Sequence, residues 1–113
     1  LKPPQTQAGE KSRGFMVELN EFKERVENII NSFDIALVSC GGYANPICSF
    51  IYEKGKSAIY VGGVLQMYFG ILGARWIQER NDIVNLFHNK HWSRPKVNER
   101  PRDSKKVEGG CYW

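Results

Sequence analysis

The feature of this sequence that most constrains its fold is a short pattern that occurs twice. The apolar run 33–40 is followed by Gly41-Gly42, and the apolar run 57–61 is followed by Gly62-Gly63. Both runs are rich in strand-forming residues and are shorter than most helices. The chain between them is long enough for a short helix, which is typical of two parallel strands joined by a right-handed crossover. The sequence therefore predicts a β-α-β unit and an α/β fold.

Helical patterns surround these two runs. Apolar residues recur at helical spacing over residues 16–31, which predicts an amphipathic helix. In the crossover, Asn45 can cap a short helix, Pro46 suits its first turn, and Gly55 lies where helices commonly end. Further helical turns are expected over residues 64–69 and 82–88. Two prolines in the opening segment 2–7 exclude a helix there and favour an edge strand or a lead-in.

The length of the chain limits its domain organisation. With 113 residues, 42% of them hydrophobic, it can bury one core. We therefore expect a single domain over residues 1–113 with an extended tail over residues 93–113, anchored by Trp92, Tyr112 and Trp113. The chain opens on Leu1 with no initiator Met and no basic-then-apolar leader, so we expect a fragment of a longer protein. No apolar run approaches the roughly 20 residues of a spanning helix, so no membrane partner is expected.

The cysteines and histidines favour neither disulfides nor a metal. Cys40, Cys48 and Cys111 form no CxxC pair, which indicates reduced thiols and a cytoplasmic protein. His88 and His91 are three residues apart, but no third ligand has a fitting position, so no metal is expected. The sequence contains no GxSxG elbow and no P-loop, and the catalytic residues stay unknown.

The first glycine turn is a candidate ligand site. Gly41, Gly42, Tyr43 and Asn45 fall between the end of a strand and the start of a helix, where backbone N–H groups can bind a phosphate. A nicotinamide dehydrogenase is disfavoured, because there is no GxGxxG and no acidic residue ends the second strand. The alternative is that the glycines only allow the strand and the helix to pack closely. The sequence supports the two interpretations equally.

The second glycine turn and the chain after it add further candidate ligand residues, each of which also has a purely structural interpretation. Gly62, Gly63 and Gln66 follow the second strand, and Gln66 can either bond a ligand hydroxyl or base or hold the loop's own backbone. Arg75 and Trp76 combine a permanent cation with a flat ring, which suits phosphate or sugar contact. The alternative for this pair is a surface arginine stacked over a core tryptophan.

The positive charge is concentrated near the end of the chain. The net charge is +4, and residues 88–106 carry seven Lys or Arg against two acids. Such a segment can bind the phosphates of a nucleic acid. Trp92 is the only aromatic residue within it, so base stacking is not suggested, and a solvated segment is favoured over a nucleic-acid partner.

Several longer motifs give the chain a family resemblance that covers nearly its whole length. It resembles the C-terminal half of an uncharacterised family of glycosyltransferase-like proteins from bacteria, algae and large viruses. The family is itself similar to the Rossmann-like glycosyltransferase fold called GT-D. The residues that carry the resemblance are Pro3-Pro4-Gln5-Thr6, residues 33–37, Cys40-Gly41-Gly42-Tyr43, residues 55–59, residues 62–66, residues 69–71, residues 73–76, residues 91–95 and residues 107–113.

The resemblance implies a Rossmann-like, three-layer half-domain. Its short parallel sheet would have about three strands flanked by helices, and its glycine turns would border a nucleotide-sugar cleft. In GT-D enzymes an Asp-x-Glu motif in the other half binds the donor and metal, and this sequence lacks it, so the isolated chain should be inactive. Ala44 stands where many relatives have glycine, which puts close phosphate approach at that turn in doubt.

Two functions therefore remain as expectations. The first is a glycosyltransferase-like domain whose Gly41, Gly42, Tyr43, Asn45, Gly62, Gly63, Gln66, Arg75 and Trp76 contribute to binding a nucleotide sugar, with no other cofactor evident. The alternative is a non-enzymatic interaction module in which an exposed sheet edge pairs with a second copy or with another protein.

Overall fold

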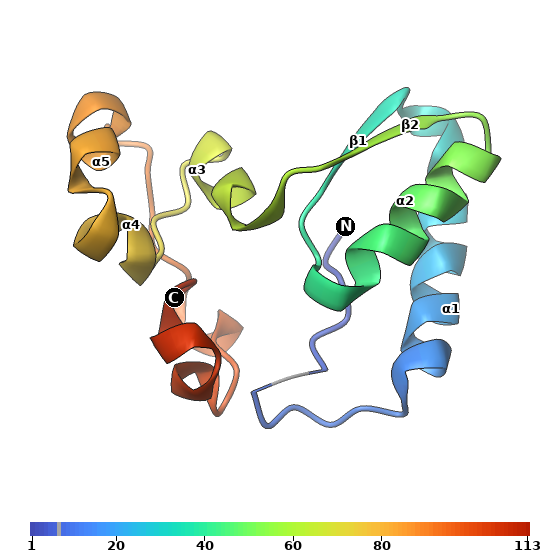
Figure 1. Ribbon diagram of the computed structural model, residues 1–113, viewed down its shortest axis with the longest axis horizontal. Helices are drawn as coiled ribbons and strands as arrows, with labels where there is room; N and C mark the ends of the chain where they lie inside the picture. The colour runs from blue at the N-terminus through green and yellow to red at the C-terminus, as the bar shows by residue number, and fades with distance from the viewer. Residues whose placement is uncertain (7) are drawn as a thin grey trace. The chain divides into compact units, whose positions relative to one another are not determined.

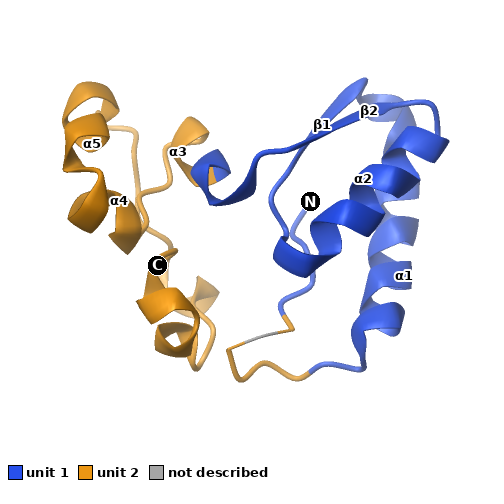
Figure 2. Cartoon of the chain, viewed as in Figure 1, with its two compact units in different colours: residues 1–5, 12–65 blue, residues 6–11, 66–113 orange. Residues whose placement is uncertain are grey.

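The computed structural model describes residues 1–6 and 8–113. The chain divides into two compact units, one formed by Leu1–Gln5 with Ser12–Leu65 and the other by Thr6–Lys11 with Gln66–Trp113 (Figure 2). We call them unit 1 and unit 2, and each is described by itself.

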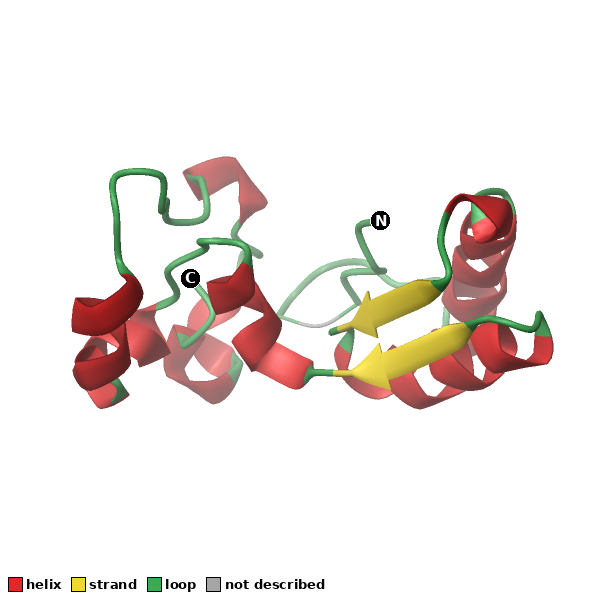
Figure 3. Cartoon of the chain, turned by 90° about the horizontal axis from the view of Figure 1, so that it is seen from above, coloured by secondary structure: helices red, strands yellow, loops and turns green. Residues whose placement is uncertain are grey.

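Unit 1 contains the predicted β-α-β unit. Strand β1 (Ile35–Val38) and strand β2 (Ser57–Tyr60) run parallel, and helix α2 (Ala44–Glu53) connects them (Figures 1 and 3). In their register, Leu37 lies opposite Ile59. The pairing continues one residue further, where the Val61 N–H donates to the Val38 carbonyl at 2.9 Å. The α/β class and the parallel pair are thus confirmed.

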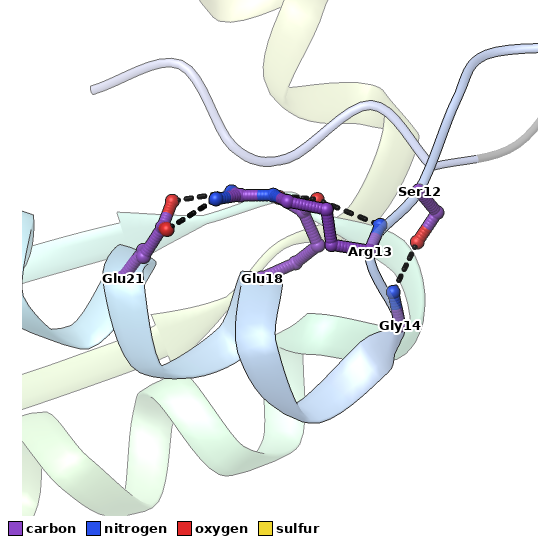
Figure 4. Close-up of polar contacts among 5 residues, drawn as sticks. All are labelled: Ser12, Arg13, Gly14, Glu18 and Glu21. Carbon is purple, nitrogen blue, oxygen red and sulfur yellow. Dashed lines mark hydrogen bonds and ion pairs between the residues drawn. The ribbon is translucent and has the colours of Figure 1, made fainter.

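Helix α1 (Phe15–Glu27) precedes the sheet and is shorter than the predicted helix over residues 16–31. Gly14, at its start, has a φ of 102° and no side chain with which to cap it. The Arg13 guanidinium instead donates to both carboxylate oxygens of Glu21 at 2.5 Å and to Glu18 at 3.3 Å (Figure 4). The two acids are three residues apart and so share one face of the helix. Arg13 thereby ties the chain before α1 to the first turns of the helix.

The core of unit 1 lies on one face of the sheet. It gathers residues from α1, β1, α2 and the turn between the last two: Leu19, Phe22, Val26, Val38, Tyr43, Ala44, Ile47 and Ile51. Ile35, Leu37 and Ile59 point to the other face and are 59%, 48% and 51% exposed. A continuous apolar run such as 33–40 suits a strand that is buried on both faces, yet β1 is buried on one face only. Both helices pack against the face that carries Ala36 and Val38, so they cover one side only.

The sheet has two strands within the described part of the chain, fewer than the roughly three that the family resemblance implies. In the opening segment, residues 2–6 form neither helix nor strand, which fits a lead-in, and Gln7 lies outside the described residues. The Lys2 carbonyl accepts a hydrogen bond from the Arg25 guanidinium at 2.8 Å, which holds this segment against α1.

Unit 2 consists of short helices and turns. Helices α3 (Leu65–Tyr68) and α5 (Asn81–Phe87) confirm the predicted turns at 64–69 and 82–88. Helix α4 (Ala74–Glu79) was not predicted, because Gly70 and Gly73 read as interruptions. The tail was expected to be extended, yet it forms three 3-10 turns, at Val97–Glu99, Ser104–Lys106 and Glu108–Gly110. Such turns need only i to i+3 bonds and no apolar periodicity, so the sequence pattern did not reveal them.

Few hydrophobic side chains of unit 2 are buried. They are Met67 on α3, Trp76 on α4 and Cys111 in the tail. Among the described residues, no helix is both long enough and apolar enough to cross a membrane.

Candidate functional site

Each strand of unit 1 leads at its carboxyl end into one of the two glycine turns. After β1 the chain makes a 3-10 turn at Gly41–Tyr43, and after β2 it makes another at Gly62–Val64. Both follow the carboxyl ends of adjacent parallel strands, and these ends are joined by the hydrogen bond between Val61 and Val38. The carboxyl edge of such a sheet is where α/β proteins bind ligands.

The glycines in these turns are not explained by tight packing. Gly41 and Gly62 have φ values of +53° and +72°, a conformation that glycine adopts at no steric cost. No described atom lies within 4 Å of a Cβ built on Gly41 or on Gly42. Gly42 has no positive φ either, so the described structure requires glycine there neither for backbone shape nor for packing. The interpretation that these glycines only allow the strand and the helix to pack closely therefore does not apply to Gly41 and Gly42.

Tyr43 and Asn45 have different positions from those the sequence suggested. The Tyr43 side chain is buried in the core, and its ring stacks on Phe15 with centroids 4.7 Å apart. Asn45 was predicted to cap the helix, but α2 already begins at Ala44 and Tyr43 occupies the capping position. The cap prediction is therefore wrong, while Pro46 does lie in the first turn as predicted.

The charges near this edge come from the first turns of α1 and α2. The first turn of α2 carries no acidic residue. The N–H groups of Tyr43 and Ala44 donate to the carbonyls of Cys40 and Gly41, because the 3-10 turn runs directly into the helix. The stacking of Phe15 on Tyr43 brings the start of α1 to the same end of unit 1. Glu18 and Glu21 near that start both pair with Arg13, which offsets one of their two negative charges.

An apolar pocket of about 180 Å³ lies beside the first turn, within unit 1. It is lined by residues of the N-terminal segment, α1, β1 and α2: Leu1, Pro3, Phe22, Val26, Ile29, Phe33, Ala36, Leu37, Val38, Ser39, Cys40, Ile47 and Ile51. Burial raises the pKa of the Cys40 thiol to about 11, and the neighbouring Cys48 adds to the rise. The Cys40 thiol is therefore protonated near neutral pH.

In unit 2 the predicted site residues mainly hold the tail. Arg75 forms an ion pair with Glu108, and its guanidinium lies 5.3 Å from the ring centroid of Tyr112. The aromatic partner of Arg75 is thus Tyr112, whereas the alternative interpretation placed it over Trp76, which is buried. The Gln66 amide donates to the Tyr112 carbonyl at 3.3 Å, in line with its interpretation as a loop-holding residue.

The same tail residues converge on one carboxylate oxygen. Oε2 of Glu108 accepts from the Tyr112 hydroxyl at 3.2 Å and from the Cys111 thiol at 3.5 Å, in addition to Arg75. These hydrogen bonds, that of Arg75 foremost, lower the pKa of Glu108. We call Arg75, Glu108, Cys111 and Tyr112 the tail clasp.

Gly73 allows the tail clasp to close. The Arg75 N–H donates to the Cys111 carbonyl at 2.9 Å, and a Cβ on Gly73 would lie only 2.8 Å from that same oxygen. Glu108, Cys111 and Tyr112 were not predicted to form a cluster. The signal available was the unexplained Gly73 beside Arg75, since a glycine at a helix start can mark a close backbone approach.

The nine predicted ligand residues divide between the two units. Gly41, Gly42, Tyr43, Asn45, Gly62 and Gly63 belong to unit 1, and Gln66, Arg75 and Trp76 belong to unit 2. Within the described residues, no group of three His, Cys, Asp or Glu side chains is placed to hold a metal. Comparison with protein-family models, with curated proteins and with solved structures finds no significant match to this chain.

Proposed function

We propose that unit 1 forms part of a nucleotide-sugar cleft, with the two glycine turns facing the diphosphate. The observation that carries the proposal is that both turns follow the carboxyl ends of the paired strands β1 and β2, together with the open space above Gly41 and Gly42. A phosphate that approaches these glycines meets backbone N–H groups and the start of α2.

The layering of unit 1 supports the same proposal. A Rossmann-like sheet is covered by helices on both faces, whereas Ile35, Leu37 and Ile59 leave one apolar face of this sheet exposed. We propose that the β1-α2-β2 unit belongs to a larger three-layer sheet, and that a further layer covers this face in the complete cleft.

The proposed role is binding rather than turnover by this chain alone. The glycine turns present backbone donors and no acidic side chain, so they can hold a diphosphate but supply neither a general base nor metal-ligating carboxylates. In unit 2, Arg75 is engaged by Glu108, Gln66 by the tail, and Trp76 is buried. The proposal therefore rests on unit 1.

The test is an amide NMR titration of the chain with a panel of nucleotides and nucleotide sugars. We expect shifts at Gly41–Tyr43 and Gly62–Val64. Gly42→Val should weaken binding at least about tenfold, because its side chain would occupy the open space without straining the backbone. Ser49→Val, which places the same side chain on the exposed side of α2, is the control. Equal binding by the Gly42→Val variant, or shifts confined to other residues, would contradict the proposal.

A second candidate function is an interaction or homo-oligomerisation module. The exposed apolar face that carries Ile35, Leu37 and Ile59 supports it. An isolated two-stranded sheet is marginally stable, and its strand edges are free to pair with another chain. If unit 1 associates through this face, the mass measured by light scattering should rise with concentration. Leu37→Lys should then return the chain to a monomer, and a mass that is constant over the whole range would exclude this function.

A further inference from the structure

The acids of unit 2 are all engaged by its own residues. Within Gln66–Trp113, Glu79 and Glu108 pair with Arg75, Asp82 pairs with Arg80, and Asp103 pairs with Lys106. The Glu99 carboxylate accepts from the Lys96 backbone N–H at 2.7 Å. Glu10, which also belongs to unit 2, accepts from the Arg102 N–H at 3.3 Å. Four of these six carboxylates form ion pairs, whereas Glu10 and Glu99 are held by backbone N–H groups and keep their charge.

The remaining cations of unit 2 are concentrated in one stretch of the chain. Within residues 90–105, all of which are described, six exposed basic side chains have no acidic partner: Lys90, Arg94, Lys96, Arg100, Arg102 and Lys105. Arg94 donates to the carbonyl oxygen of Trp113 at 3.0 Å, which fixes its position without neutralising its charge. A partner for this stretch has to supply the negative charge.

The structure adds exposed aromatic rings to this basic stretch. Segment 70–72 pairs with Ser93, whose N–H donates to the Gly70 carbonyl at 2.9 Å, and a Cβ on Gly70 would lie 3.3 Å from the Trp92 ring. Tyr68 and Phe69 directly precede this contact and are 72% and 68% exposed. Two rings that the sequence places outside the basic segment are therefore close to Trp92.

A further ring lies on the α5 side of Trp92. The His88 ring makes an edge contact with Trp92, with centroids 5.9 Å apart. Phe87 directly precedes His88 and is 62% exposed. Trp92, which lies within the basic stretch, thus contacts the neighbours of two exposed aromatic segments. We call Tyr68, Phe69, Phe87, Trp92 and the six basic residues the basic aromatic surface.

We propose that the basic aromatic surface of unit 2 binds single-stranded nucleic acid. The cations contact the phosphates and the exposed rings stack on bases, a combination that binds single strands with little sequence preference. This function is independent of the nucleotide-sugar cleft proposed for unit 1. An anionic membrane would also supply negative charge, but peripheral membrane proteins commonly bind through a long amphipathic helix, and α3, α4 and α5 have only four, six and seven residues.

The test is fluorescence anisotropy of the full chain with a labelled single strand of about 20 nucleotides, an unlabelled duplex serving as competitor. We expect binding that weakens steeply between about 50 and about 200 mM salt, with a log-log slope near −4 for six phosphate contacts on a single strand. A duplex of equal charge should compete less well, because its bases cannot reach the rings.

Two variants separate the contributions of charge and stacking. Replacing Lys90, Lys96 and Arg100 together by Gln should weaken binding at least about tenfold and reduce the salt slope by about 2. The matched control replaces Lys2, Lys23 and Lys56 of unit 1 by Gln, which removes the same charge and should change the affinity by less than about twofold. Phe69→Ala with Phe87→Ala should weaken binding about tenfold and leave the salt slope unchanged.

Three outcomes would overturn the proposal. One is no binding of the single strand at the lowest salt, and another is an equal loss in the unit 1 control, which would indicate attraction by net charge alone. The third is binding to vesicles that contain acidic lipids with none to the single strand, which would identify a membrane as the partner. Far-UV circular dichroism of each variant must match the wild type, so that lost binding reports the surface and not the fold.

Discussion

The two units of this chain are built on different physical principles. Unit 1 has equal numbers of acidic and basic residues, and eight buried residues from two helices, a strand and a turn form one core. Unit 2 carries the whole net charge of +4 and buries three hydrophobic side chains. Its tail is held largely by hydrogen bonds and an ion pair at Arg75 and Glu108. Substitutions in the core should therefore destabilise unit 1, and substitutions that open the tail clasp should destabilise unit 2.

The largest expected effect comes from the core of unit 1. Ile47 is 2% exposed, so Ile47→Ala should cost about 2–5 kcal/mol, from lost burial and from the cavity left behind. Hydrogen exchange of the β1 and β2 amides measures this loss. Ile59→Ala is the matched control, since Ile59 is 51% exposed and the same truncation should cost much less.

The same variant, Ile47→Ala, tests whether the two units unfold separately. All three tryptophans, Trp76, Trp92 and Trp113, belong to unit 2, so tryptophan fluorescence reports on that unit. If the two units unfold separately, Ile47→Ala should leave the midpoint of the fluorescence transition in place. A fluorescence midpoint that moves with the hydrogen-exchange loss would show that the chain unfolds as a single cooperative unit.

A smaller effect is expected at the tail clasp. In Gly73→Ala the added methyl would meet the Cys111 carbonyl at 2.8 Å, and such overpacking typically costs about 1–3 kcal/mol. The tryptophan fluorescence transition should shift to lower denaturant. Gly42→Ala, which meets no described atom within 4 Å, should shift neither this transition nor the exchange of unit 1. If Gly73→Ala behaves like the control, the tail does not depend on this close approach.

The part of the fold that the sequence predicted is the part governed by local periodicity. The strands, α2 with Pro46 in its first turn, and the left-handed Gly55 all follow from short patterns of apolar residues, proline and glycine. The start of α2 was misplaced because Asn45 looked like a cap, whereas the helix begins at Ala44 without one. Helix ends depend on the neighbouring chain as well as on propensity, so a lone capping residue is a weak signal.

What could not be predicted depends on contacts between distant residues. Glu108 lies 33 positions from Arg75, and no spacing rule connects them. The rings beside the basic segment were missed for the same reason, because the hydrogen bonds between segment 70–72 and Ser93 bring them there. Sequence reasoning placed the glycine turns correctly at the strand ends. The sequence alone could not show whether the glycines allow close packing or leave room for a ligand. That distinction depends on the atoms that surround Gly42 in the fold.

The tail clasp should also respond to pH. Arg75 lowers the pKa of Glu108 below its ordinary value of 4.5, so the ionised carboxylate is favoured when the clasp is closed. Its contribution to the stability of unit 2 should be complete above pH 4.5 and be lost as the pH falls through the lowered pKa. The side-chain NMR signals of Tyr112 and Trp113 should follow this loss. Glu108→Gln should remove the pH dependence, whereas Asp82→Asn, which breaks an ion pair outside the clasp, should preserve it.

The smallest effects concern the thiols, which allow both units to be compared in one experiment. Burial raises the pKa of Cys40 in unit 1 and of Cys111 in unit 2, so alkylation of the native chain near neutral pH should be slower than that of the unfolded chain. A raised thiol pKa adds stability that is present below its ordinary value of 9.0, and for Cys40 it should be lost as the pH rises through about 11.

The two thiols should then respond to different substitutions. Ile47→Ala opens the core beside Cys40 and should speed its alkylation, whereas Gly73→Ala should expose Cys111 and leave Cys40 slow. Mass spectrometry of the alkylated peptides distinguishes the two sites. If either substitution accelerates both thiols equally, the core of unit 1 and the tail clasp are energetically coupled, and the separation between a packed unit and a clasped unit does not hold.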